Sequence, residues 1–450
     1  MVNLNLNLMS RKVIFWSIIM ALGGFLFGFD TAVISGAEQA IQKYWSLSDL
    51  QHGFTISIAL IGTVTGAFLG RIPADSIGRK KSLIIIALIF LFSSLGTAFA
   101  TNWYLFVTLR FIGGLGVGAS SVIAPIFISE IAPASVRGRL VILFQGNIVL
   151  GILVSYGSNY LIGLLSQDSW RLMLGIMAVP SLIFLVLLRF VPESPRWLIL
   201  KKSQNDEAKR ILQLTNPDGY EQEMQSIIDA KNEETQDVAA ESLFTKRYRF
   251  PATLAVLFAF FNQVSGINAI IYYAPRIFGM AGLGKSAALL STTGIGAVNL
   301  TFTMLAIFFI DNIGRKKLML IGSVGLIITL GLVAWSFYGG NINGHLVTIY
   351  LMAYIAFFAF SQGAVIWVFI SEIFPNQVRA KGQTLGSFTH WVMATLIAFS
   401  FPYITNTLGG GNTFLFFTVM MVFQLIFVWK IMPETKGKSL EQIERTLTMH

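Results

Sequence analysis

Cysteine is absent from the 450 residues of the sequence, and charged residues make up only 12% of it. The first absence excludes a disulfide framework, thiol catalysis and any metal site built from cysteine. The second excludes an ordinary soluble domain, in which about 25% of residues are charged. Histidine is scarce as well, with four residues. Because there is also no metal-ligand cluster, nucleophile elbow or phosphate-binding loop, the sequence does not indicate an enzyme, and neither a cofactor nor a metal ion is expected.

Apolar residues are abundant instead, at 54% of the chain. They form twelve runs of about 20 or more residues, the length that a helix needs to cross a bilayer. The first run is too long for the core of a signal peptide, which has about 7–15 residues, so we expect it to be retained. The predicted fold class is therefore an all-α polytopic membrane protein with twelve transmembrane helices, at 13–36, 53–73, 82–101, 103–128, 140–165, 170–191, 251–279, 287–310, 318–338, 346–374, 383–407 and 412–432.

The positive charges lie between these runs, which argues against a nucleic-acid-binding patch despite a net charge of +10. If the odd-to-even connections are placed outside, only Lys43, Arg171, Arg276 and Lys285 lie there. Arg110 is inside a run, and the other 27 of the 32 Lys and Arg residues lie on the opposite side. Short loops rich in Lys and Arg face the cytoplasm, so both chain ends are predicted to be cytoplasmic.

Three motifs occur twice. The segment 75–81 recurs at 311–317, the segment 129–137 at 371–379, and Pro192-Glu193 at 433–434, with offsets of 236, 242 and 241 residues. The chain is therefore predicted to consist of two related six-helix bundles, 1–192 and 251–432, followed by a tail at 433–450. Two homologous bundles with a site at their interface are the architecture of an alternating-access carrier.

The polar segment 193–250 separates the two bundles. Helical periodicity at Lys201–Gln213 and Tyr220–Lys231, broken by the turn signal Asn216–Gly219, predicts a pair of cytoplasmic linker helices. A regulatory or docking role is the alternative.

Each repeated motif brings carboxylates and guanidinium groups to helix ends on the same side. Bidentate pairs between such groups could latch the cytoplasmic ends of the bundles together and release when the bundles rock apart. Static ion pairs that only fix the topology are the alternative. The residues of this predicted cytoplasmic gate are Asp75, Arg79, Glu130, Arg137, Glu193, Asp311, Arg315, Glu372, Arg379 and Glu434.

The seventh apolar run carries an unusual set of polar side chains, among them Asn262, Gln263, Asn268 and Tyr272. Unpartnered amides cost several kcal/mol each in hydrocarbon, so such a cluster needs a wet or polar environment. Asn268 and Tyr272 are four residues apart and share a helix face, and Gly266 can loosen the helix before them. This run could line a cavity that binds a molecule rich in hydroxyl groups.

Several ordered motifs resemble the sugar porter family of the major facilitator superfamily. They are 70–81, the segments around Glu130 and Glu372, Pro192–Leu198, Gln263–Asn268 and 433–437. The segment Phe27–Gly36 is most similar to the bacterial xylose–proton symporter type. The resemblance covers essentially the whole chain and implies a twelve-helix major facilitator fold and transport of a monosaccharide.

That resemblance also implies which residues bind sugar: Gln145, Gln263, Asn268, Tyr272, Asn299 and Trp391, to which we add Phe27, Gln362 and His390. Amides can donate to and accept from sugar hydroxyls, and Trp391 can stack on a pyranose ring. For a single amide, interhelical hydrogen bonding is the alternative. Asn262, Gln362 and His390 depart from the usual family pattern, which leaves the identity of the sugar open. His390 could be a second proton site, although a neutral hydrogen-bonding contact is the simpler interpretation.

Asp30 and Arg110 are ionisable groups inside apolar runs, which marks a function by default. Both are expected roughly 10 Å below the outer surface and could pair. Separation of the pair would let Asp30 take up a proton, as a symporter requires. Facilitative animal relatives usually have Asn at this position, so the carboxylate favours proton-coupled symport of a monosaccharide. A facilitative uniporter, and a purely structural pair, are the alternatives.

The expected partners are a monosaccharide, a proton and the lipid bilayer, and no nucleic acid. A plasma membrane location in a prokaryote and a functional monomer are predicted. A sugar sensor without transport is disfavoured, because relatives of that kind have long signalling tails and only about 18 residues follow the last run.

Overall fold

The computed structural model describes residues 11–133, 136–165, 169–234, 242–243, 245–338, 343–375, 377–438 and 442–443, and these residues contain helices and no β-strand. The chain ends, whose side of the membrane was predicted, lie outside the described residues. The all-α fold class is confirmed. The helices of the first half are α1 (Arg11–Tyr44), α2 (Asp49–Leu69), α3 (Arg71–Ile77), α4 (Arg79–Phe99), α5 (Trp103–Ile131), α6 (Arg137–Gly163), α7 (Trp170–Gly175) and α8 (Ala178–Leu187).

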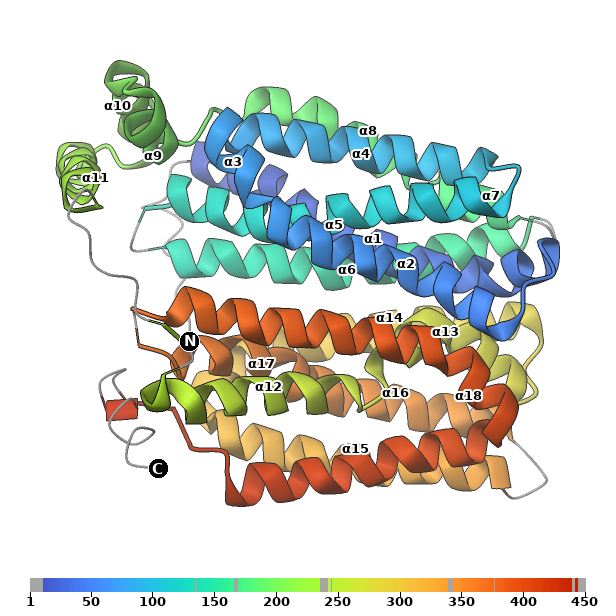
Figure 1. The fold of residues 1–450 in the computed structure, drawn as a ribbon. Helices are drawn as coiled ribbons and strands as arrows, with labels where there is room; N and C mark the ends of the chain where they lie inside the picture. The colour runs from blue at the N-terminus through green and yellow to red at the C-terminus, as the bar shows by residue number, and fades with distance from the viewer. Residues whose placement is uncertain are drawn as a thin grey trace. The chain divides into compact units, whose positions relative to one another are not determined.

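Three helices of the linker region and seven of the second half follow: α9 (Pro195–Trp197), α10 (Asn205–Thr215), α11 (Tyr220–Glu234), α12 (Arg249–Gln263), α13 (Ile267–Met280), α14 (Lys285–Ile313), α15 (Arg315–Tyr338), α16 (Gly344–Phe360), α17 (Gln362–Glu372) and α18 (Arg379–Lys430). Figure 1 shows them coloured along the chain.

Eleven helical stretches of the described chain are long and apolar enough to cross a membrane. The last of them, α18, has 52 residues. At about 1.5 Å per residue it would be roughly 78 Å long, far more than the ~30 Å of a hydrocarbon core. Gly409 interrupts it with φ 79°, so α18 makes two crossings. The predicted twelve spans are therefore confirmed.

The chain divides into two compact units. Unit 1 contains the described residues of Met1–Thr31, Gly62–Ser155 and Leu174–Ala239, and unit 2 those of Ala32–Ile61, Tyr156–Met173 and Ala240–His450. The end of each unit that carries Gly78 or Gly314 is called the motif end below, and the opposite end the far end. The far-end parts of α1, α2 and α6 thus pack with helices of the second half. The domain boundaries expected from the sequence remain a prediction.

Glycine lets neighbouring helices of unit 1 approach closely. A Cβ atom on Gly28 of α1 would lie 1.9 Å from the carbonyl oxygen of Ile148 on α6. A Cβ atom on Gly118 of α5 would lie 2.0 Å from the carbonyl oxygen of Thr63 on α2. No other residue fits these contacts, and small residues at helix contacts are the usual solution in membrane proteins.

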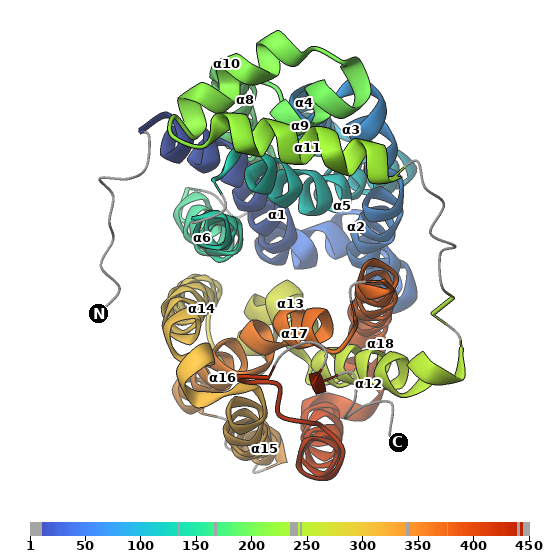
Figure 2. The same cartoon turned by 90° about the vertical axis from the view of Figure 1, so that its left-hand side faces the viewer.

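The linker helices lie beyond the motif end of α4 and α5 in unit 1 (Figures 1 and 2). They form a small core from Trp197, Leu198, Ile211 and Leu212. α10 begins at Asn205 rather than at the predicted Lys201, because a π-helical turn ends at Ser203 in the left-handed conformation, with φ 55°. The predicted turn between the two longer linker helices is present.

Candidate functional site

The seventh span is broken in its middle. α12 ends at Gln263 and α13 begins at Ile267, with Gly266 at φ 86° between them. That conformation favours glycine, and a Cβ atom there would also lie 2.7 Å from the ring of Phe417. A second irregularity follows at Tyr273, with φ −123°, two residues before Pro275. The predicted loosening at Gly266 is therefore a complete break between two helices, with Asn262 and Gln263 before it and Asn268 after it.

A chain of polar side chains surrounds this break in unit 2. Gln263 donates through Nε2 to Asn262 Oδ1 at 2.9 Å and lies 3.2 Å from His390 Nδ1, while Asn268 Nδ2 donates to Gln263 Oε1 at 2.6 Å. Asn262 Nδ2 is buried and has no hydrogen-bond partner among the described residues. The structure therefore brings Gln263, Asn268 and His390 together, with one amide donor left over.

Aromatic residues border the same polar chain. The ring of His390 lies 5.0 Å from Trp367 and 5.0 Å from Trp391, centroid to centroid. Tyr272 is buried in α13, more than one turn beyond the break. Asn299 is half-buried on α14 and accepts from Thr303 Oγ1 at 3.4 Å. An amide group edged by indole rings is suited to a ligand with both hydroxyl groups and an apolar ring face.

Gln362, expected with this group, lies in a different buried chain. Its Nε2 donates to Gln424 Oε1 at 2.7 Å, and Gln424 donates in turn to Ser323 Oγ at 2.9 Å. Gln362 exposes none of its surface. Its hydrogen bonds link α17, α18 and α15, which is the interhelical alternative considered for single amides.

Two candidate sugar-binding residues belong to unit 1. Phe27 on α1 and Gln145 on α6 are both half-buried, so each presents part of its side chain outside the packed interior of that unit. The two helices that carry them are neighbours, as the contact at Gly28 shows.

The predicted pair of Asp30 and Arg110 is present in the interior of unit 1. Arg110 Nη1 donates to Asp30 Oδ1 at 2.8 Å, and the side chains of Arg110 and Asp30 are 3% and 5% exposed. Arg110 Nε and Nη2 have no partner among the described residues. An ion pair this deeply buried, with donors to spare, is costly to keep unless its geometry serves a purpose.

In unit 1, the repeated motif caps the start of α4 with a residue that is distant in the sequence. α4 begins at Arg79, and the first N–H groups of a helix have no partner within it. The carboxylate of Glu193 supplies one: its Oε1 accepts from Arg79 N at 2.9 Å and from Lys80 N at 3.1 Å. A Cβ atom on Gly78, at φ 100°, would lie 2.3 Å from Glu193 Oε2, which explains the glycine. Burial raises the pKa of Glu193, although the N–H groups of Ser194, Lys80 and Arg79 favour its ionised form.

The guanidinium of Arg79 completes this cluster. It binds Glu130 in a bidentate manner, Nε to Oε2 at 2.9 Å and Nη2 to Oε1 at 3.0 Å, and donates through Nη1 to Asp75 at 3.2 Å. Trp197 Nε1 donates to the carbonyl oxygen of Asp75 at 2.9 Å, which joins the linker helices to it.

Unit 2 repeats the arrangement. Glu434 accepts from Arg315 N and Lys316 N at 3.0 and 3.1 Å, Arg315 binds Glu372 at 2.7 and 3.2 Å, and Arg315 Nη2 lies 3.0 Å from Asp311. Both clusters therefore tie segments within one unit. A latch across units remains a prediction.

Two further gate residues lie apart from these clusters. Arg137 is exposed, and Arg379 Nε donates to the carbonyl oxygen of Phe374 at 3.3 Å.

A further buried ionic group, which the sequence analysis missed, lies at the far end of unit 2. Glu38 Oε2 lies 2.6 Å from His52 Nε2 and 2.6 Å from Arg276 Nη2. The charge distribution placed Arg276 with the outer connections. Its position inside the seventh apolar run was a signal of the same kind as Arg110.

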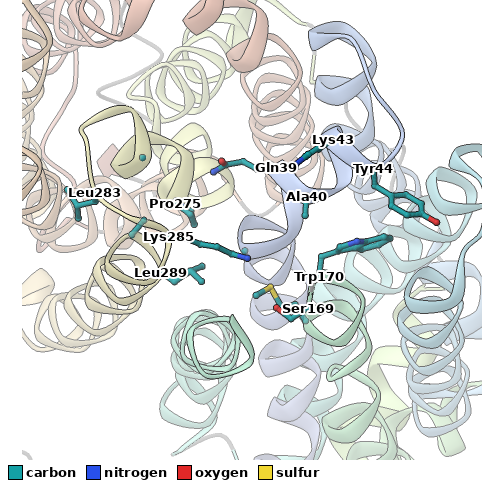
Figure 3. Close-up of a pocket in the computed structure, with 14 residues that line it drawn as sticks. Gln39, Ala40, Lys43, Tyr44, Ser169, Trp170, Pro275, Leu283, Lys285 and Leu289 are labelled. Carbon is teal, nitrogen blue, oxygen red and sulfur yellow. The ribbon is translucent and has the colours of Figure 1, made fainter. Parts of the chain in front are cut away.

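A cavity of about 640 Å³ lies at the same end of unit 2, and its lining includes Gln39 and Pro275, the sequence neighbours of Glu38 and Arg276. Figure 3 shows Gln39 and Lys43 of α1, Trp170 of α7 and Lys285 of α14 around it. None of its lining residues belongs to the predicted sugar-binding set. It is therefore a feature of the far end, separate from the polar chain at Gly266.

Comparisons with known proteins agree with this architecture. The profile of the family described as "Sugar (and other) transporter" matches residues 16–447. The arabinose-proton symporter of Bacillus subtilis is 38% identical over 443 residues, which cover 96% of this chain and 94% of that protein. The glucose transporter of Staphylococcus epidermidis is 38% identical over 440 residues, covering 96% of each. The inward-open structure of the xylose transporter of Escherichia coli is 34% identical and covers 96% of this chain and 99% of its own, with a TM-score of 0.84.

Proposed function

We propose, from the premise that the chain belongs to the sugar transporter family of the major facilitator superfamily, that it carries a monosaccharide across a membrane together with a proton. Membership of the family makes it a multi-pass membrane transporter and not an enzyme. Relatives are named as carriers of arabinose, glucose and xylose, so the proposed substrate is a pentose or a hexose.

The buried pair of Asp30 and Arg110 is the observation that supports proton coupling most directly. Arg110 supplies the counter-charge of the Asp30 carboxylate. A rearrangement that withdraws the guanidinium would leave a buried carboxylate without its partner, and the coupled proton would take the place of that partner. Two donors of Arg110 lack partners among the described residues, so a full set of hydrogen bonds does not lock the guanidinium in place. One proton moving through 100 mV supplies roughly 2.3 kcal/mol. That sustains about 50-fold accumulation of sugar, at about 1.4 kcal/mol per tenfold.

For the sugar, we propose the polar chain at the break of the seventh span. Gln263 bonds to both Asn262 and Asn268 in the structure, and Asn262 Nδ2 has no partner among the described residues. Hydroxyl groups of a sugar would replace the existing bonds with equivalent ones and could accept from that amide, so binding would cost little polar burial. Proposed ligands are Gln263, Asn268, Tyr272, Asn299, His390 and Trp391, with Gln145 and Phe27 contributing from unit 1. The hydrogen bonds of Gln362 to Gln424 favour a packing role, and we leave Gln362 out.

The proposed orientation places both chain ends and the motif ends in the cytoplasm and the far ends outside. The distribution of Lys and Arg supports it. In this orientation the helix-capping clusters of Glu193 and Glu434 lie at the cytoplasmic gate, and the plasma membrane is the proposed location.

Uptake into proteoliposomes tests the proposal. Radiolabelled arabinose, xylose and glucose are supplied with and without a pH gradient, to the native protein and to Asp30→Asn. A symporter should accumulate one of these sugars only with the gradient, and Asp30→Asn should lose accumulation but keep sugar exchange. The matched control is Asp206→Asn, an exposed acid in the linker, which should behave as the native protein does.

A facilitative uniporter is the second candidate. It predicts that the native protein and Asp30→Asn both equilibrate the sugar across the membrane, and that neither accumulates it. Uptake of none of the three sugars, with a pH gradient or without one, would contradict both.

A further inference from the structure

Three ionisable side chains meet in the interior at the far end of unit 2. Glu38 of α1 and His52 of α2 expose none of their side chains, and Arg276 of α13 exposes 13%. Arg276 binds Glu38 in a bidentate manner, Nε to Oε1 at 3.0 Å and Nη2 to Oε2 at 2.6 Å. It also donates to Gln42 Oε1 at 2.5 Å. α1 and α2 come from the first repeat and α13 from the second, so the group joins the two repeats at this end.

One proton must lie between Glu38 and His52. Their atoms Oε2 and Nε2 are 2.6 Å apart, a distance that requires a shared proton. With that proton on His52, the imidazole is neutral and Glu38 balances Arg276, so the group has no net charge. Such a group is tolerated in an interior from which water is excluded, because the ion pair is complete.

His52 still has one open position. Its Nδ1 is buried and has no hydrogen-bond partner among the described residues. A second proton there would make an imidazolium whose Nε2 lies 3.3 Å from Arg276 Nη2, and the group would carry a net positive charge without water. Histidine is the side chain whose charge ordinarily changes near neutral pH.

The other charged or titratable groups near His52 do not relieve that charge. Tyr273 of α13 lies edge-on to the imidazole at 6.1 Å, and its hydroxyl donates to Ala398 O at 2.8 Å. Asp49 of α2 is engaged by Asn406 Nδ2 of α18 at 2.8 Å and by Gln42 Nε2 at 3.3 Å. The charge of Glu38 is already balanced by Arg276.

We propose that Glu38, His52 and Arg276 form a second proton-binding site, at which a proton on His52 Nδ1 opens the far end of the carrier. Opening lets water reach the imidazolium, so the open state binds this proton more tightly than the closed state. By linkage, proton binding then shifts the equilibrium toward the open state, by a factor equal to the ratio of the proton affinities of the open and closed states. The inference rests on the proposed function, since it assumes a carrier that opens at this end.

The absence of cysteine allows a direct test without any background labelling. Thr55→Cys places a thiol one turn after His52, at a fully buried position. Ser286→Cys places a reference thiol at an exposed position of the same unit. Each single-cysteine protein is purified as the full chain in detergent and labelled with a charged maleimide between pH 8 and pH 5.5. The ratio of the two labelling rates cancels the pH dependence of maleimide chemistry to first order.

In the native background the ratio should rise about tenfold or more as the pH falls, which corresponds to an open state that binds the proton at least tenfold more tightly. His52→Gln keeps a donor toward Glu38 but cannot titrate, so its ratio should stay low and flat. Glu38→Gln leaves Arg276 without its counter-charge, so its ratio should be high at every pH. His345→Gln removes an exposed histidine at the start of α16 and should keep the native response.

A native ratio that does not change with pH overturns the inference, and so does a pH response that persists in His52→Gln. If His52→Gln does not yield a monodisperse protein, His52→Asn carries the same expectation. Because this assay needs no sugar, it is independent of the uptake experiment: a pH-dependent ratio together with uptake that ignores the pH gradient would leave the site in place and reject symport.

Discussion

Replacement of Glu193 by alanine should destabilise unit 1 more than is usual for a half-buried residue. Its carboxylate accepts from Arg79 N, Lys80 N and Ser194 N, at 2.9, 3.1 and 2.8 Å. Alanine leaves the first turn of α4 without its cap. Loss of an N-terminal cap costs about 0.5–2 kcal/mol, and each backbone N–H left without a partner in a partly buried place adds about 1 kcal/mol or more.

Together these effects predict a loss of about 2–4 kcal/mol in the free energy of unfolding. Thermal unfolding of purified protein in detergent, followed by tryptophan fluorescence, measures it as a fall in midpoint of several degrees. Glu207→Ala, an exposed acid in the first turn of α10, is the control and should shift the midpoint by a degree or less. A midpoint for Glu193→Ala that equals that of the control would refute the capping argument.

The raised pKa of Glu193 also predicts the direction in which the stability of the protein changes with pH. Burial raises the pKa of Glu193 in the folded protein. A raised folded-state pKa means that the contribution to stability is complete below the unfolded value, near 4.3, and is lost as the pH rises through the folded-state pKa. The stability of the native protein relative to Glu193→Gln should therefore fall as the pH is raised from about 4 to 7. A difference that grows over this range would contradict it.

Two further predictions separate binding from packing. Gln263→Ala should weaken sugar binding about 10- to 100-fold, the cost of one or two lost hydrogen bonds to the ligand. The half-saturating sugar concentration for exchange measures this change. Gln424→Ala, in the other buried amide chain, should lower the unfolding midpoint and leave the half-saturating concentration within about twofold of the native value. Gly78→Ala should lower the midpoint by several degrees, because its Cβ would meet the Glu193 carboxylate at a φ of 100°, whereas Gly138→Ala, with nothing within 4 Å, should not; equal midpoints for the two glycine variants would count against the account of the motif.

Local chemistry was readable from the sequence. Hydropathy located the spans because each must bury its own backbone hydrogen bonds in lipid. Gly266 marked the break in the seventh span, since polar side chains on both sides of a glycine in an apolar run indicate a local departure from regular helix. Asp30 and Arg110 could be paired because both lie well inside their runs at matching depth, whereas Arg71, Arg171 and Arg189 lie within two residues of the end of a run.

Long-range partners were not readable in the same way. Glu38 and Arg276 are separated by 238 positions, and neither residue alone predicts the other. Gln362 was expected among the sugar-binding residues, but a position in an apolar run does not give the direction of a side chain around its helix, and Gln362 donates to Gln424 instead. The clusters at Arg79 and Arg315 were predicted by composition, yet their pairing within one unit depends on how Glu193 and Glu434 return to their helices.

That return has a consequence for synthesis. Glu193, which caps the start of α4, lies 114 positions after Arg79, and Glu434, which caps the start of α15, lies 119 positions after Arg315. A growing chain therefore inserts each of these helices before its first backbone N–H groups have their acceptor, and three more crossings must be made before that acceptor leaves the ribosome. In each repeat, the helix cap next to Gly78 or Gly314 is thus the last of these contacts to form. A chain halted just before Glu193 or Glu434 would contain every crossing of that repeat and still lack the carboxylate that caps the helix.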